Sequence, residues 1–300
     1  MANNVLIGTN VTWTTAGNWS TGAAPVNSDV VFLTNNQTLI TGGLVNTGVR
    51  LTTLNLVMDF TGRVGTNNVS GNTYLQISAV TGNLGIPAAG GAVVNGSSLF
   101  NWDAGTSSTV INVLNTSNSG SAQGQSPYKL LGSALTINLM GGNISVAALP
   151  TENATISTMN VIASGQGVSP QAYLGPGCNL GTMTLTGGFV VSNSQTLVSS
   201  AVISGNNVRL VHQGTGGFNS LVVDNGGVTY NGSGSVNSLS LTGTIDLSGG
   251  GGTVVFGSVT LYAGAVFYDP LGRASFSTTP TLVNCTRANV SLNLGLGRYL

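Results

Sequence analysis

The sequence predicts an all-β protein, specifically a right-handed parallel β-helix with loop excursions and capped ends. The main evidence is a short apolar pattern that recurs five times between residues 180 and 267. Its anchor residues are spaced by 18, 20, 18 and 20 positions: Met183, Ala201, Leu221, Leu239 and Val259. A glycine follows each anchor strand within a few residues, and a second apolar pair follows each glycine. Repeats of about 20 residues, made of short strands and turns, are typical of β-solenoids.

Within each repeat, aliphatic residues alternate with Ser, Thr or Asn. Alternation of this kind places one set of side chains on each face of a strand. One repeat alone cannot bury its apolar face. Stacked coils can do so, because each lies about 4.8 Å from the next. We therefore expect the anchor residues to form one interior column, with hydroxyl and amide side chains outside.

Residues 1–34 differ in composition from the rest and predict an N-terminal cap or docking segment. They contain Trp13, Trp19 and Pro25. An open terminal coil would present an unpaired strand edge, which proteins usually cover. Two interpretations remain open for the tryptophans. They pack inside the cap, or Trp13 and Trp19 are glycan-binding residues on which a sugar ring stacks.

Residues 35–269 predict the solenoid itself. Anchors at residues 111, 135, 159 and 183 are 24 apart, so the earlier coils are longer than the later ones. Residues 115–128 contain almost no apolar side chains and predict a long loop. Such a loop contacts a partner or is simply mobile.

Residues 270–300 lose the period and predict a C-terminal cap or docking segment. Basic residues gather there and in the predicted long loop: Lys129, Arg273, Arg287 and Arg298. Asp269 and Pro270 stand at the start of this segment.

Charge is scarce and balanced, since Lys and Arg total 7 and Asp and Glu total 7. Binding to nucleic acid requires many basic side chains, so no nucleic-acid partner is expected. No long apolar run suggests membrane insertion, and no signal peptide is visible. Cys178 and Cys285 are either a disulfide or two buried thiols. No phosphate-binding or dinucleotide-binding motif occurs, so no cofactor is expected.

Residues able to support catalysis are few, and we predict no enzyme and no catalytic residues. Asp224 and Asp246 lie one predicted coil apart and form the one carboxylate pair that merits a test. The alternative is that both are solvated turn residues. His212 is the sole histidine, so we expect it to lie at the surface or in the packing between coils, and we predict no metal site.

The N-terminal run combines Trp13, Gly17-Asn18-Trp19, Gly22, Pro25 and Asp29-Val30. This run, followed by Gly/Asn/Thr-rich repeats, resembles the start of autotransporter-type passenger repeats. It also resembles phage virion β-helix structural proteins of the decoration or fibre type.

The phage resemblance implies a homotrimer on the exterior of a phage particle, where it contacts other virion proteins and a host-surface glycan. The alternative is a bacterial cell-surface adhesin or matrix protein that binds glycans. A depolymerising enzyme is the third hypothesis.

Overall fold

The computed structural model describes residues 2–8, 12–34, 39–68, 71–87, 99–116, 126–162 and 168–295. The protein is all-β, as predicted, and 25 of its strands join in one continuous sheet. Two further strands form an antiparallel hairpin, β6 (Thr66–Asn68) and β7 (Gly71–Thr73). Helical turns in the described ranges are limited to the 3-10 helices η1 (Ala16–Asn18) and η2 (Arg287–Asn289).

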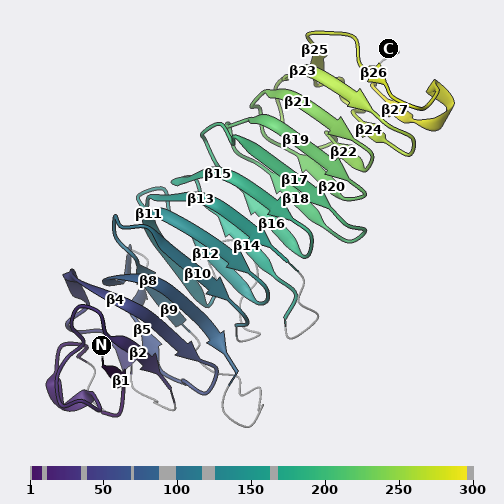
Figure 1. Cartoon of the computed structure of the whole chain (residues 1–300). Coiled ribbons are helices and arrows are strands. Elements are labelled where there is room, and N and C mark those ends of the chain that lie inside the picture. The colour runs from purple at the N-terminus through teal and green to yellow at the C-terminus, as the bar shows by residue number, and fades with distance from the viewer. Residues whose placement is uncertain are drawn as a thin grey trace.

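The large sheet consists of two rows of parallel strands (Figure 1). Row A contains β1 (Asn3–Val5), β2 (Val30–Leu33), β4 (Val45–Val57), β8 (Leu75–Ile86), β10 (Thr109–Val113), β11 (Tyr128–Leu139), β13 (Ala154–Val161), β15 (Cys178–Leu185), β17 (Ser200–Ser204), β19 (Phe218–Asp224), β21 (Val236–Leu241), β23 (Val254–Leu261), β25 (Ala274–Phe276) and β26 (Thr281–Leu282). Row B contains β3 (Leu39–Ile40), β5 (Arg63–Val64), β9 (Leu99–Asp103), β12 (Asn143–Val146), β14 (Gln171–Leu174), β16 (Phe189–Ser192), β18 (Arg209–His212), β20 (Gly227–Tyr230), β22 (Thr244–Asp246), β24 (Val266–Tyr268) and β27 (Ser291–Asn293).

The chain alternates between the two rows, and we call one passage through both rows a tier. Row A strands pair in parallel with row A strands of the neighbouring tiers, and row B strands do the same. The long strand β11 belongs to both rows, because its first residues pair with β9 and β12 and its last residues pair with β10 and β13. The termini lie at opposite ends of the elongated stack (Figure 1).

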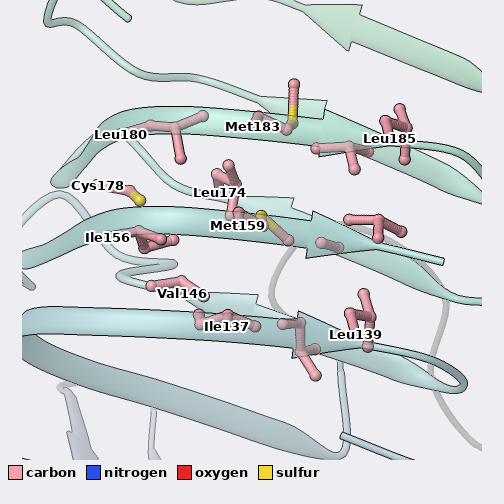
Figure 2. Packing of buried hydrophobic residues seen from close by; sticks show 14 of the residues in the cluster. Ile137, Leu139, Val146, Ile156, Met159, Leu174, Cys178, Leu180, Met183 and Leu185 are labelled. Atoms are coloured by element: carbon pink, nitrogen blue, oxygen red, sulfur yellow. The ribbon is translucent and has the colours of Figure 1, made fainter. Parts of the chain in front are cut away.

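Alternating side chains fill the space between the rows. The register places Met183, Ala201, Leu221, Leu239 and Val259 opposite one another in successive row A strands. All five are at most 3% exposed, so the predicted interior column is confirmed. Figure 2 shows part of this packing, where Met159 and Met183 lie above Ile137 on successive strands. Each buried aliphatic side chain contributes about 1.5–3 kcal/mol to folding before entropy is counted.

The outer face of row A carries a ladder of amides. Asn83 donates to Asn55, Asn112 to Asn83, Asn138 to Asn112 and Asn160 to Asn138, through Nδ2···Oδ1 distances of 2.9–3.0 Å. In-register stacking of identical amides satisfies their hydrogen bonds without any charge. The ladder itself is therefore polar but uncharged over five tiers.

Strand pairing crosses both boundaries that the sequence suggested. Strand β1 pairs with β2, so row A starts inside residues 1–34. At the other end, β25 and β26 pair with β23, and β27 pairs with β24, all beyond residue 270. The two predicted end segments thus contribute strands to the same sheet as residues 35–269.

One detail of the predicted pattern was wrong, and a second can be checked only at its ends. Ile137, and not Leu135, lies opposite Ile111 and Met159, so the spacings here are 26 and 22 residues and not 24. Most of the predicted loop at 115–128 falls at residues 117–125, outside the described residues. Its last residue, Tyr128, begins β11 and is only 2% exposed.

Candidate functional site

The two N-terminal tryptophans face the interior. Trp13 and Trp19 are each 1% exposed, and their rings pack edge to face with centroids 4.8 Å apart. The Nε1–H of Trp19 donates to the Trp13 carbonyl at 2.8 Å. A sugar ring stacks on an exposed aromatic face, and neither indole offers one. The geometry therefore favours packing within the cap over the glycan platform predicted as an alternative.

The strand register does not place Asp224 opposite Asp246, the carboxylate pair that the sequence suggested. Asp224 ends β19 in row A, and its Oδ1 accepts a hydrogen bond from the Thr242 hydroxyl at 2.9 Å. Asp246 lies in β22 of row B, and its Oδ1 accepts from the Ser248 amide at 2.8 Å. Asp224 is thus bound by the turn of the following tier and Asp246 by its own turn, and both contacts are structural.

Asp246 does line an open groove of about 490 Å³ on the outer face of row B. Arg209, Thr229 and the turn asparagines Asn206, Asn207 and Asn225 also line it. This groove collects amide, hydroxyl and charged groups in the same place, a chemistry suited to polar ligands.

His212 is buried in the packing between tiers, one of the two positions that the sequence allowed. Its ring packs against Phe218 and Tyr230 at centroid distances of 5.0 and 4.9 Å. The Gly216 carbonyl lies 2.6 Å from Nε2, so this nitrogen carries the proton, and the buried Nδ1 has no partner in the described structure. Burial lowers the pKa of His212, partly offset by this hydrogen bond, and favours the neutral ring.

The cysteines are both free thiols, with Cys178 buried and Cys285 partly buried. Burial raises the pKa of Cys178 to about 12, which makes this thiol unreactive. Within the described ranges, no three His, Cys, Asp or Glu side chains gather closely enough to hold a metal ion.

The hairpin β6–β7 creates the polar cluster that sequence reasoning missed. Gly65 begins it with a φ of +79°, and a Cβ at this position would lie 2.2 Å from the Thr73 carbonyl oxygen. Beneath the hairpin, buried Asn101 donates from Nδ2 to the carbonyls of Thr66 and Thr73 and to Asn67 Oδ1. These contacts fix the hairpin against row B and hold the side chain of Asn72 over the neighbouring tiers.

Asn72 lies between the only lysine and the only glutamate of the chain. Lys129 Nζ donates to Asn72 Oδ1 at 3.3 Å, and Asn72 Nδ2 donates to Glu152 Oε1 at 2.8 Å. The Tyr74 hydroxyl donates to the same Oε1 at 2.5 Å, and the Leu149 amide donates to Oε2 at 3.0 Å. Lys129 is 5% exposed and Glu152 is 8% exposed.

This cluster is an unusual environment for an ammonium group. Burial lowers the pKa of Lys129, and the charge of Glu152 only partly opposes this. Burial and the hydrogen bond to Glu152 raise the pKa of Tyr74, so its phenol stays protonated and remains a donor to the carboxylate. The cluster therefore joins an amine with a lowered pKa, a primary amide and a carboxylate.

Stacking of the tiers, and not proximity in sequence, assembles these residues. Asn72 is 57 residues from Lys129 and 80 residues from Glu152. The sequence placed Lys129 with the long loop, whereas the structure places it within β11. The one available signal was that a single Lys and a single Glu occur in 300 residues.

No family model, curated protein or solved structure matches the chain in the three comparisons. No helix in the described part of the chain is long and apolar enough to cross a bilayer.

Proposed function

We propose that this chain is a right-handed parallel β-helix that serves as a non-enzymatic structural protein on the exterior of a bacteriophage particle. Its role is that of a capsid decoration protein or a fibre, present as a homotrimer. The observation that carries the proposal is the parallel pairing that runs through both rows from β1 to β27. A stack of this length forms a stiff support between two distant ends.

The chemistry of the surface supports a structural role. The amide ladder on row A is uncharged, and only seven residues in the chain are Lys or Arg. Two of these, Lys129 and Arg273, are buried, which leaves few sites for proteases that cut at basic residues. Resistance of this kind suits a protein exposed outside a cell. The resemblance of the N-terminal run to virion β-helix proteins points in the same direction.

Purified particles from the source of this sequence test the proposal. We expect peptides of this chain in the particle proteome and antibody labelling on the outer surface of the particles. The purified protein should have the mass of three chains by light scattering. Particles that lack the chain, while lysed host cells contain it, would contradict a virion role. A monomer in solution and on particles would contradict the trimer alone.

A second candidate is a bacterial cell-surface adhesin or matrix protein that binds glycans. The polar groove beside Arg209 and Asp246 favours it. A glycan array with the full chain is the test, with Asp246→Ala as the groove variant and Trp19→Phe as the control within the cap. Binding that Asp246→Ala abolishes and Trp19→Phe leaves intact would support the groove.

A further inference from the structure

The cluster of Lys129, Asn72 and Glu152 has the composition and contacts of a self-modifying site. A primary amine and a primary amide touch directly, with Lys129 Nζ at 3.3 Å from Asn72 Oδ1. A carboxylate touches the other end of the same amide, with Glu152 Oε1 at 2.8 Å from Asn72 Nδ2. Rotating the amide by half a turn would exchange its oxygen and nitrogen, and the amide carbon would still lie between Lys129 and Glu152.

We propose that Lys129 and Asn72 form an intramolecular isopeptide bond, with Glu152 moving the protons. The bond that forms joins Lys129 Nζ to Asn72 Cγ, and the bond that breaks joins Asn72 Cγ to Nδ2. The reaction consumes one amine and one amide and releases ammonia. It requires no oxidant, metal or cofactor, because no atom changes its oxidation state.

The proton transfers balance within the three side chains. A proton first passes from Lys129 to Glu152 through the amide that contacts both: Nζ protonates Asn72 Oδ1, and Asn72 Nδ2 gives a proton to Glu152 Oε1. This leaves a neutral amine, the imidic acid form of Asn72 and a carboxylic acid. The amine adds to Asn72 Cγ, and Glu152 gives its proton to Nδ2 and takes one from Nζ. Ammonia then leaves with the proton of Oδ1 and takes the last proton from Glu152 as ammonium, which restores the carboxylate. General acid–base transfer needs hydrogen-bond reach, and the 2.8 Å contact between Oε1 and Nδ2 provides it.

Burial favours each step. A charged ammonium is not nucleophilic, and desolvation lowers the pKa of Lys129, so the neutral amine becomes accessible. Only one hydrogen bond, to the amide itself, holds Nζ in the described structure. The Tyr74 phenol and the Leu149 amide fix the Glu152 carboxylate from two sides. Reactants held in contact in this way react as parts of one molecule, at a high effective concentration.

The bond would join the hairpin to the two rows of strands. Asn72 lies in the β6–β7 hairpin, which is not part of either row. Lys129 lies in β11, which pairs with strands of both rows. The link would tie this excursion covalently to the stack and close the chain between residues 72 and 129 into a ring.

Intact-mass spectrometry of the denatured full chain tests the proposal. We expect a mass below that of the sequence by one ammonia. We also expect trypsin to leave one fragment that runs from Val64 to Arg209, because a modified Lys129 resists cleavage. Fragment ions should place the branch between Lys129 and Asn72. An unshifted wild-type mass after prolonged incubation would overturn the proposal, whatever the variants do.

Matched variants separate this reaction from other losses of ammonia. Lys129→Arg and Glu152→Gln should each show the unmodified mass, whereas Asn160→Ala, an amide change in the row A ladder outside the cluster, should retain the loss. A succinimide at an Asn-Gly step also releases ammonia, but it hydrolyses in mild base and would persist in Lys129→Arg. Ammonia loss that survives Lys129→Arg, or that maps to another asparagine, would refute the assignment. Circular dichroism checks that each variant folds.

Discussion

Arg273 connects the last tiers through its guanidinium group, and its replacement gives the sharpest stability prediction. This side chain is 6% exposed and donates to six backbone carbonyls. Nη1 donates to Tyr230 at 2.7 Å, Nη2 to Gly232 at 2.5 Å and Nε to Gly252 at 3.0 Å. Further donations go to the carbonyls of Leu247, Gly249 and Gly251. The segments that follow β20 and β22 are thereby held to the segment that precedes β25.

We expect Arg273→Met to lower the free energy of unfolding by about 3–5 kcal/mol. Hydrogen bonds to a charged group contribute about 1.5–3 kcal/mol each, but burying the guanidinium offsets part of that gain. Methionine fills much of the same space and leaves the carbonyls without a donor. At about 2 °C per kcal/mol for a chain of this length, the melting temperature should fall by roughly 6–10 °C.

Thermal unfolding followed by circular dichroism measures this change. Hydrogen exchange then locates it, because the effect should concentrate in β20, β22 and β25 and spare β10 and β13. The matched control is Arg209→Met, since the Arg209 side chain is exposed and, within the described ranges, donates one hydrogen bond, to Thr229 at 3.2 Å. A melting temperature for Arg273→Met within about 1 °C of the Arg209→Met value would refute the reasoning.

Two further predictions concern the core. Gly82→Ala should lower the free energy of unfolding by about 1–3 kcal/mol in urea, because the new Cβ would lie 2.4 Å from the Trp102 ring. The cost of Gly82→Ala should be smaller when it is measured in a Trp102→Phe background, which lacks the ring atoms that clash. An equal cost of Gly82→Ala in the wild-type and Trp102→Phe backgrounds would contradict the clash. His212 has a lowered pKa, so the unfolded state binds more protons and stability should fall as the pH drops below 6.5. Titration of His212 should add at most about 1.4 kcal/mol per pH unit to the slope of the unfolding free energy against pH, and His212→Gln should lack this contribution. Parallel pH profiles of wild type and His212→Gln would exclude His212 as the cause.

The interior column was predictable because the apolar period is regular where the tiers are simple. The anchors from Met183 to Val259 recur every 18 or 20 residues within alternating strands, so this spacing gave their register. The period fails where side chains from the other row fill the space. Gly82 occupies the position that Leu54 and Ile111 hold in neighbouring tiers, because Trp102 from row B packs there instead.

The polar cluster was beyond the reach of sequence patterns. Asn72 joins it through an antiparallel hairpin that no repeat encodes, and Glu152 joins it through a turn in which its carboxylate accepts the Leu149 amide. Their meeting depends on how three separate tiers stack. The packing of His212, by contrast, was one of two expected positions, because an isolated histidine in an apolar strand has few other roles.

Opposite placement of the two termini has a mechanical consequence. Tension applied at the ends would act along the stacking direction (Figure 1) and would detach the outermost tier first. Each passage of about 20 residues would release roughly 70 Å of contour length, so extension should proceed in regular steps. A covalent tie between residues 72 and 129 would keep the enclosed stretch from lengthening, and the total extension would then stop short of the full contour.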